Sequence, residues 1–309
     1  MVPCPRLGRY ARVLTTLAAA CLCVASAHAQ QVALTFDDLP AHGPLPAGVT
    51  RQQVITDILD ALKASGTPPV YGFINGVRQQ ENPSDASVLD LWRRFGYPLG
   101  NHTWSHMNLN DHTAAEWEAD LLKNEQTLAP LMNNADWHWV RFPYLSEGNT
   151  PEKTAEVRTF LAAHDYRIAG VTMSFGDYLF NEPYARCLAR SDSAAVTQLE
   201  DLFLEASKND LLDRRAMAHA AFGHDIPYVL LMHVGAFDAH MLPRLLALYR
   251  QQGVSFVSLQ QAESDLFYRN DLDPRMPPFP DSLEAAVAAK RVSPPHHGTP
   301  LDALDKLCR

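Results

Sequence analysis

The chain has 309 residues, of which 47% are hydrophobic and 20% are charged, and its formal net charge is −9. This length and composition are typical of a globular enzyme and fit one large α/β barrel or two small domains. The acidic balance argues against nucleic acid as a partner, because binding to a phosphate backbone needs clustered Lys and Arg.

The N-terminus has the pattern of a signal peptide, which we assign to residues 1–29. A basic region is followed by an apolar run over residues 13–27 and by a small-x-small cleavage site at Ala27-His28-Ala29. We therefore expect cleavage after Ala29 and an exported protein, periplasmic or secreted, without stable membrane insertion. The alternative is an uncleaved anchor helix, although the apolar run is short for a membrane span.

Cleavage would change both the charge and the cysteine content. The mature chain would carry 23 Lys and Arg against 35 Asp and Glu, a net charge of −12, which argues against a polybasic membrane anchor. Of five cysteines, Cys187 and Cys308 would remain. An exported compartment permits a disulfide between them, and two free thiols are the alternative.

Short, nearly continuous apolar runs predict strands that are buried on both faces, as in a parallel sheet. The predicted strands span residues 31–36, 70–75, 97–102, 138–142, 166–170, 228–233 and 254–258. Helical patterns alternate with them over residues 54–66, 114–131, 151–163, 192–206, 239–252, 258–267 and 282–291. Thr113 and Glu116 form a capping box, and Thr150-Pro151 marks another helix start.

Repeated strand-helix units predict a parallel sheet with right-handed crossovers. Because the chain has no dinucleotide-binding glycine loop, we expect a (β/α) barrel of about seven strands. We assign the barrel to residues 30–270. Residues 271–309 contain two Pro-rich stretches and are expected to form a tail packed on the barrel.

Carboxylates and imidazoles follow two of the predicted strands. Asp37 and Asp38 come after one apolar run, and His102 and His106 follow another. Active sites of barrels are built at the carboxyl ends of the strands. One Asp with two His is a ligand set for an open catalytic zinc, and the second Asp is then free to act as a base.

Four motifs in order resemble those of the polysaccharide deacetylases, the fourth carbohydrate esterase family. They are Thr35-Phe36-Asp37-Asp38, His102-Thr103-Trp104-Ser105-His106, Arg141-Phe142-Pro143-Tyr144 and Leu231-Met232-His233. The resemblance covers roughly residues 31 to 260. It implies a deformed barrel, a divalent metal and the removal of N-acetyl or O-acetyl groups from sugars.

The resemblance implies that Asp38, His102 and His106 bind the metal, for which we expect zinc, with cobalt or manganese as alternatives. Both imidazoles would share one face if the chain turned helical after His102. The alternative is a helix-capping Asp and two surface histidines.

The resemblance also implies the catalytic groups. Asp37 matches the base that takes a proton from the attacking water, and Arg141 matches the residue that orients it. His233 matches the general acid for the leaving amine. Asp177 approximates the position of the family's Asp that orients this histidine and raises its pKa, although an ordinary loop acid is the alternative.

Three further residues match positions that contact substrate. The backbone N–H of Tyr144 would help to hold the oxyanion, Leu231 would pack on the acetyl methyl group, and Tyr178 would line the groove in place of a Trp. The chain departs from the family at Leu39 and Leu145, where Gly is usual. These departures put the substrate in doubt rather than the reaction.

We therefore predict a metal-dependent deacetylase whose partner is an acetylated cell-wall or extracellular glycan. The alternatives are a non-catalytic glycan-binding protein of the same fold and an amidohydrolase acting on a non-sugar amide. Among the histidines outside the motifs, His42 and His224 are expected to lie closest to the site. The sequence does not indicate the oligomeric state or the polymer.

Overall fold

The structure is a computed structural model that describes residue 1 and residues 30–133, 135–278 and 282–309. The expected signal peptide therefore lies outside the described residues, apart from Met1. Within the described part of the chain, no helix combines the length and the apolar character that a membrane crossing requires.

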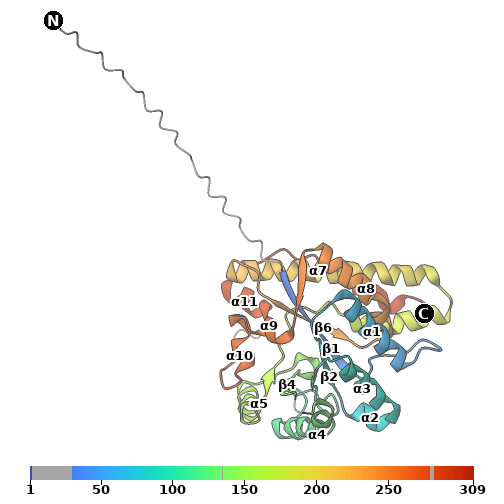
Figure 1. Cartoon of the computed structure of the whole chain (residues 1–309), viewed down its shortest axis with the longest axis horizontal. Coiled ribbons are helices and arrows are strands. Elements are labelled where there is room, and N and C mark those ends of the chain that lie inside the picture. Colours follow the sequence, from blue (N-terminus) through green and yellow to red (C-terminus); the bar gives the residue numbers. More distant parts are fainter. Residues whose placement is uncertain (2–29, 134, 279–281) are drawn as a thin grey trace.

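Seven parallel strands form one curled sheet at the centre of the molecule (Figure 1). The strands are β1 (Gln30–Leu39), β2 (Tyr71–Ile74), β3 (Leu99–Asn101), β4 (Trp139–Val140), β5 (Arg167–Ile168), β6 (Tyr228–His233) and β7 (Val254–Val257). Their order is β5-β4-β3-β2-β1-β6, with β7 paired to β1. A single bridge between Met173 and Leu230 joins the chain after β5 to β6. The predicted deformed barrel of seven parallel strands is confirmed.

Helices surround the sheet, with α7 and α8 at the top of Figure 1 and α4 and α5 at the bottom. Eleven α-helices are described: α1 (Arg51–Ser65), α2 (Val77–Glu81), α3 (Ala86–Arg94), α4 (Ala114–Met132), α5 (Pro151–Ala163), α6 (Asn181–Ala189), α7 (Ser193–Phe222), α8 (Ala236–Gln251), α9 (Leu259–Glu263), α10 (Arg269–Leu272) and α11 (Leu283–Lys290). The predicted caps are present. Thr113 and Glu116 form a reciprocal capping box at α4, and the Thr150 hydroxyl accepts from the backbone of Lys153 at α5.

Two predicted helices had the wrong length, and several short helices were not predicted. α7 has 30 residues rather than 15, because its buried stripe continues past Ala206 through Leu211 and Ala218 to the left-handed Gly223. The helix expected over residues 258–267 ends at Glu263, and a 3₁₀ turn follows. Four helices, α2, α3, α6 and α10, were not predicted, since none of them is longer than nine residues.

Apolar side chains fill both faces of the sheet. The inner face carries Tyr71, Phe73, Trp139 and Val229, which pack with residues of α9 to close the centre of the barrel. The outer face carries the main core, which β1, β2 and β6 share with α1, α3 and α8. Because a packed interior leaves no room for substrate, reactive groups must lie at the rim of the barrel.

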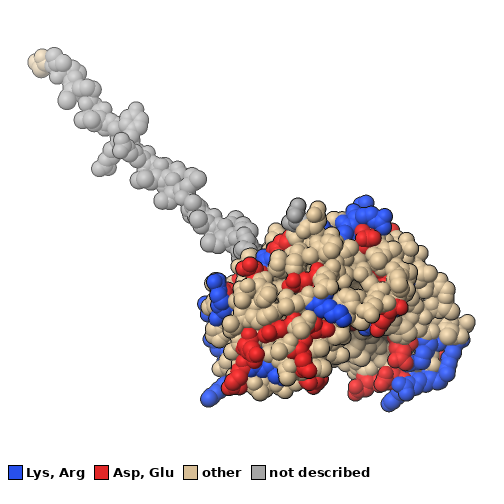
Figure 2. All heavy atoms as spheres, turned by 90° about the horizontal axis from the view of Figure 1, so that it is seen from below, with Lys and Arg blue, Asp and Glu red and all other residues tan. Residues whose placement is uncertain are grey.

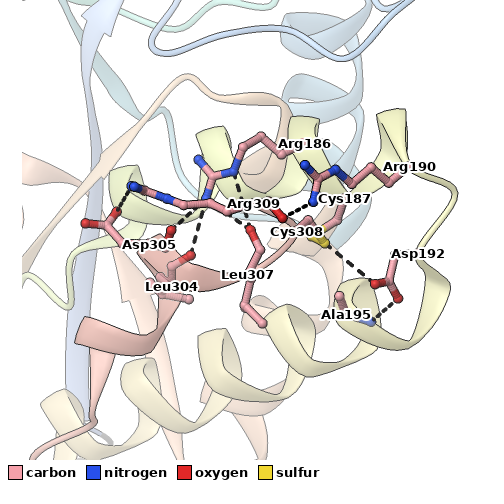
Figure 3. Close-up of a disulfide and its surroundings, with 10 residues drawn as sticks. All are labelled: Arg186, Cys187, Arg190, Asp192, Ala195, Leu304, Asp305, Leu307, Cys308 and Arg309. Atoms are coloured by element: carbon pink, nitrogen blue, oxygen red, sulfur yellow. Dashed lines mark hydrogen bonds and ion pairs between the residues drawn. A yellow bond between two sulfur atoms is a disulfide. The ribbon is translucent and has the colours of Figure 1, made fainter.

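The C-terminal segment is fastened to α6 by a disulfide between Cys187 and Cys308, so the predicted bridge is present (Figure 3). Arg186 donates to the backbone carbonyl of Leu307, and Arg190 binds that of Arg309. α6 follows directly on the segment that carries Asp177 and Tyr178. The bridge and the two arginines therefore support one wall of the candidate site.

Candidate active site

The register of the sheet brings two reactive groups together at its carboxyl edge. β1 and β6 are parallel neighbours in which Thr35 pairs with Leu231 and Asp37 with His233. Side chains alternate along a strand, so Thr35, Asp37, Leu231 and His233 share the inner face. The central strand pair thus presents a carboxylate beside an imidazole at the mouth of the barrel.

Asp38, His102 and His106 form the first cluster, in which one ligand atom of each residue lies within 4.8 Å of the others. Asp38 Oδ1 is 3.5 Å from His102 Nε2 and 3.3 Å from His106 Nε2. Asp38 and His102 are buried, whereas His106 is partly exposed. The sequence-predicted triad is therefore assembled at one point, at the ends of β1 and β3.

The protonation of this cluster leaves lone pairs facing inward. His102 Nδ1 is 2.6 Å from the backbone carbonyl of Arg141, which can only accept, so the proton is on Nδ1 and Nε2 is a free acceptor. Burial and the neighbouring His102 lower the pKa of His106 to about 4. Burial would raise the pKa of Asp38, but the hydrogen bond from His42 and the nearby imidazoles hold it far below its usual range.

These residues fit a divalent cation. Asp38 Oδ1 is buried and has no hydrogen-bond partner among the described residues, although two imidazole nitrogens face it. Three ligand atoms that converge with no hydrogen bond to Asp38 Oδ1 suit a cation between them. Ligands about 2.0–2.1 Å from a tetrahedral metal lie roughly 3.3 Å apart, close to the two distances found here. The cluster is therefore a candidate metal site.

Asp37 is held by Arg141 within the barrel. Arg141 Nη1 donates to both carboxylate oxygens of Asp37, at 3.1 and 3.2 Å, and Nη2 donates to Thr35 Oγ1. Arg141 Nε donates to the carbonyl of Ala169, and the guanidinium packs over Phe73. Since both residues are buried, the pair fixes the orientation of the carboxylate.

His233 is held in the same manner by Asp177. The ring Nδ1 lies 3.0 Å from Asp177 Oδ1, and the backbone N–H of His233 donates to Oδ2 at 2.6 Å. Burial alone would lower the pKa of His233, but the carboxylates of Asp177, Asp38 and Asp37 raise it to about 10. The imidazole is therefore protonated at neutral pH and is positioned to give up a proton.

The loop that carries His102 and His106 is irregular, so the helix considered for this segment is absent. Thr103 and His106 have positive φ angles of 57° and 58°, and Asp38 has a φ of 61°. Such conformations cost about 1–3 kcal/mol each for non-glycine residues and are concentrated at functional sites. The two imidazoles converge because of this strained turn, with ring centroids 4.8 Å apart.

The three expected substrate contacts surround these groups. Tyr144 is 67% exposed with its ring 4.6 Å from that of His106, and Tyr178 is 44% exposed with its ring 5.2 Å from that of His233. Leu231 lies on the inner face of β6 and is nearly buried. One exposed aromatic ring thus lies beside His106 of the Asp-His-His cluster, and the other lies beside the imidazole of His233.

The two histidines outside the motifs behave differently. His42 Nδ1 lies 2.7 Å from Asp38 Oδ2, so its predicted place near the site is confirmed. His224 is exposed and binds the carbonyl of Asp225, before β6 begins, so the prediction for it was wrong. His224 is close to His233 in sequence, but it precedes the start of β6, whereas His233 lies at the end of this strand. The length of the strand therefore separates the two side chains.

Sequence reasoning missed a buried pair behind Asp177. Asp238 in α8 is fully buried, and its Oδ2 accepts from Asn181 at 2.8 Å. Asn181 also accepts from the backbone of Phe237, and a Cβ at Gly235 would lie 2.1 Å from the Asn181 side chain. The sequence feature that could have indicated this pair is Asp238, a single acidic residue among the apolar residues that α8 buries.

We expect Asp238→Asn to be at least as stable as the wild type at neutral pH. Burial and the charge of Asp177 raise the pKa of Asp238 well above its ordinary value, so the folded protein keeps this carboxyl neutral. The unfolded chain ionises above about pH 4, which favours unfolding in the wild type but not in the variant. Melting temperatures should therefore diverge as the pH rises through this value. A variant less stable than the wild type at neutral pH would contradict the assignment.

The fold and these side chains define a parallel (β/α) barrel with an Asp-His-His cluster, a buried carboxylate and a protonated imidazole at the carboxyl ends of its strands. Residues 25–168 match the family model "Polysaccharide deacetylase". These residues contain three of the four motifs, so this part of the chain is similar to the polysaccharide deacetylases.

Two curated relatives are similar over part of the chain. A chitin deacetylase from Arthroderma benhamiae is 28% identical over 125 residues, which are 40% of this chain and 30% of the relative. A peptidoglycan-N-acetylglucosamine deacetylase from Bacillus cereus is 31% identical over 114 residues, which are 37% of this chain and 36% of the relative. The match thus spans about a third of the length of these relatives.

Solved structures share the fold at low identity. A family 4 acetyl xylan esterase from Clostridium thermocellum, in complex with a cobalt ion, has 17% identity and a TM-score of 0.51 over 79% of this chain and 95% of that chain. A carbohydrate esterase family 4 pseudoenzyme from Bacillus anthracis has 17% identity and a TM-score of 0.51 over 76% of this chain and 66% of that chain.

Proposed function

We propose that this protein is a metal-dependent hydrolase that removes acetyl groups, preferentially N-acetyl groups, from a cell-wall or extracellular polysaccharide or oligosaccharide. The observation that carries the proposal is the position of Asp37 and His233, paired across β1 and β6 beside the Asp-His-His cluster. The deacetylases among the curated relatives support the class of substrate.

Asp38, His102 and His106 would hold one divalent cation, for which zinc is the first choice and cobalt or manganese are the alternatives. Such a cation would polarise an acetyl carbonyl and make a nearby water more acidic. Asp37, oriented by Arg141, would accept the proton of the attacking water.

His233 would act on the leaving group. Its protonated ring, held by Asp177, would donate a proton to the departing nitrogen, because an amine leaves poorly as an anion. Tyr144 would offer its backbone N–H to the oxyanion, Leu231 would pack on the acetyl methyl group, and Tyr178 would stack on the sugar. Each of these groups lies at the same rim of the barrel.

Acetate release from a panel of acetylated glycans tests the activity. The panel should contain peptidoglycan, chitin oligomers, acetylated xylan and an acetylated exopolysaccharide, with metal-loaded protein. Release from at least one glycan is expected. Binding to a glycan without acetate release would favour the non-catalytic alternative, and release from a non-sugar amide alone would favour the amidohydrolase.

The metal site predicts that His106→Ala loses the bound ion. Removing one of three ligands leaves the cation with two protein contacts, and a partly exposed imidazole can be replaced without disturbing the core. Elemental analysis of freshly purified wild type and variant measures the effect, with exposed His112→Ala as the matched control. Equal metal content in wild type and His106→Ala would contradict the ligand assignment.

We also propose that the protein is exported and that cleavage follows Ala29. The basic, apolar and small-x-small pattern supports this proposal, and the disulfide between Cys187 and Cys308 suits an oxidising compartment. N-terminal sequencing of periplasmic or secreted material should give a chain that starts at Gln30. A cytosolic protein that starts at Met1 would contradict it.

A further inference from the structure

His42 lies between the two halves of the candidate site, although it belongs to none of the family's motifs. It follows β1 in the loop that leads to α1. Its Nδ1 is 2.7 Å from Asp38 Oδ2, and its ring centroid is 4.7 Å from that of His233 and 6.0 Å from that of Tyr178. The side chain is about one quarter exposed, so it lines the mouth of the barrel.

Two roles for this imidazole can be distinguished by distance. Asp38, His42 and His233 also lie within 4.8 Å of one another, so they could in principle ligate a second cation. Two ligands of one tetrahedral metal lie roughly 3.3 Å apart, however, whereas 2.7 Å is a hydrogen-bond distance. A carboxylate that is not protonated can only accept, so the hydrogen lies on Nδ1 of His42.

The two oxygens of Asp38 therefore differ. Oδ2 accepts from His42, whereas Oδ1 has no hydrogen-bond partner among the described residues and faces His102 and His106. A carboxylate with one oxygen fixed by a donor cannot rotate freely about its Cβ–Cγ bond. Hydrogen bonds of this kind commonly tune metal affinity by orienting the ligand.

We propose that His42 is a positioning residue for the metal: its Nδ1–H holds Asp38 so that Oδ1 points between His102 and His106. The inference rests on the proposed metal site and adds a residue to it. His42 acts through Asp38 and is not itself a ligand.

The loop between β1 and α1 is held in place by its backbone as well as by the His42 side chain. The backbone N–H of His42 donates to the carbonyl of Val234 at 2.8 Å, which ties the loop to the end of β6. Substitution of the side chain should therefore leave the loop attached. The ring also contacts His233 and Tyr178, so a test must separate the N–H donor from the aromatic ring.

Two variants make this separation. His42→Phe keeps the ring and removes the donor, whereas His42→Asn keeps an N–H near the position of Nδ1 and removes the ring. Zinc affinity is measured by competition with a chromogenic chelator, and the melting temperature of the metal-free protein reports folding. His224→Phe, at an exposed histidine far from the cluster, is the matched control.

We expect His42→Phe to bind zinc roughly 10- to 100-fold more weakly than the wild type. His42→Asn and His224→Phe should stay close to the wild-type affinity. His42→Ala serves as a second donor-free variant if phenylalanine prevents folding, and the same loss is expected for it.

Wild-type affinity in the folded donor-free variants would overturn the inference. An equal loss in His42→Asn and His42→Phe would also overturn it, since the ring rather than the donor would then matter. Failure of the wild-type protein to bind zinc, cobalt or manganese is a separate result, because it would overturn the proposed metal-dependent function itself.

Discussion

Asp37→Asn should lower turnover about 100- to 10,000-fold while the bound metal is retained. An amide has nearly the shape of the carboxylate and can still accept from Arg141, so the barrel rim should keep its geometry. It cannot take a proton from water, however. Because Asp37 is not one of the three clustered ligands, metal content should not change.

The experiment combines acetate-release kinetics with elemental analysis of the same preparations. Asp57→Asn, at an exposed aspartate of α1, is the matched control and should behave as the wild type. Wild-type turnover in Asp37→Asn would show that another group is the base. Loss of the metal together with activity would mean that Asp37 is a ligand.

His233→Asn should also lower kcat about 100- to 10,000-fold on an N-acetylated glycan. The asparagine can donate a hydrogen bond to Asp177, so the position of Asp177 should be unchanged. It cannot act as an acid. The loss should be much smaller for an aryl acetate, because a phenolate leaves without protonation. His240→Asn, at an exposed histidine of α8, is the control.

The partner of His233 gives the expected pH dependence. Burial opposes protonation of His233, and Asp177 is the largest cause that raises its pKa to about 10. Asp177→Asn should therefore move the alkaline limb of the pH profile to lower pH. An effect on KM alone, for either variant, would mean that these residues bind substrate and do not assist the chemical step.

Much of the barrel could be predicted because buried parallel strands leave a clear apolar signal. All seven strands were found, and the start of β6 at Tyr228 and its end at His233 were predicted correctly. Helices of nine residues or fewer are too short to show a clear helical periodicity of apolar residues. The predicted range of α7 was too short because charged residues interrupt its apolar stripe near Lys208.

The site could be predicted in part for a similar reason. Asp38, His102 and His106 lie at strand ends or just beyond them, where sequence position fixes location. The strained turn that brings His106 to Asp38 has no periodicity and was mistaken for a possible helix. Asp238 and Asn181 reach the site from helices through tertiary packing, which a single sequence does not encode in any regular spacing.

Arg141 connects two groups of the candidate site to each other. Its side chain binds Asp37, its carbonyl accepts from His102, and its N–H donates to the carbonyl of Asn101. β3 and β4 pair through one residue pair, Asn101 and Val140, so few hydrogen bonds hold these two strands together. Any displacement of β4 should carry the carboxylate and the imidazole along together, because both are tethered to the same residue. Thermal motion would then shift this pair as a unit, and its alignment should persist on warming until the wall itself opens.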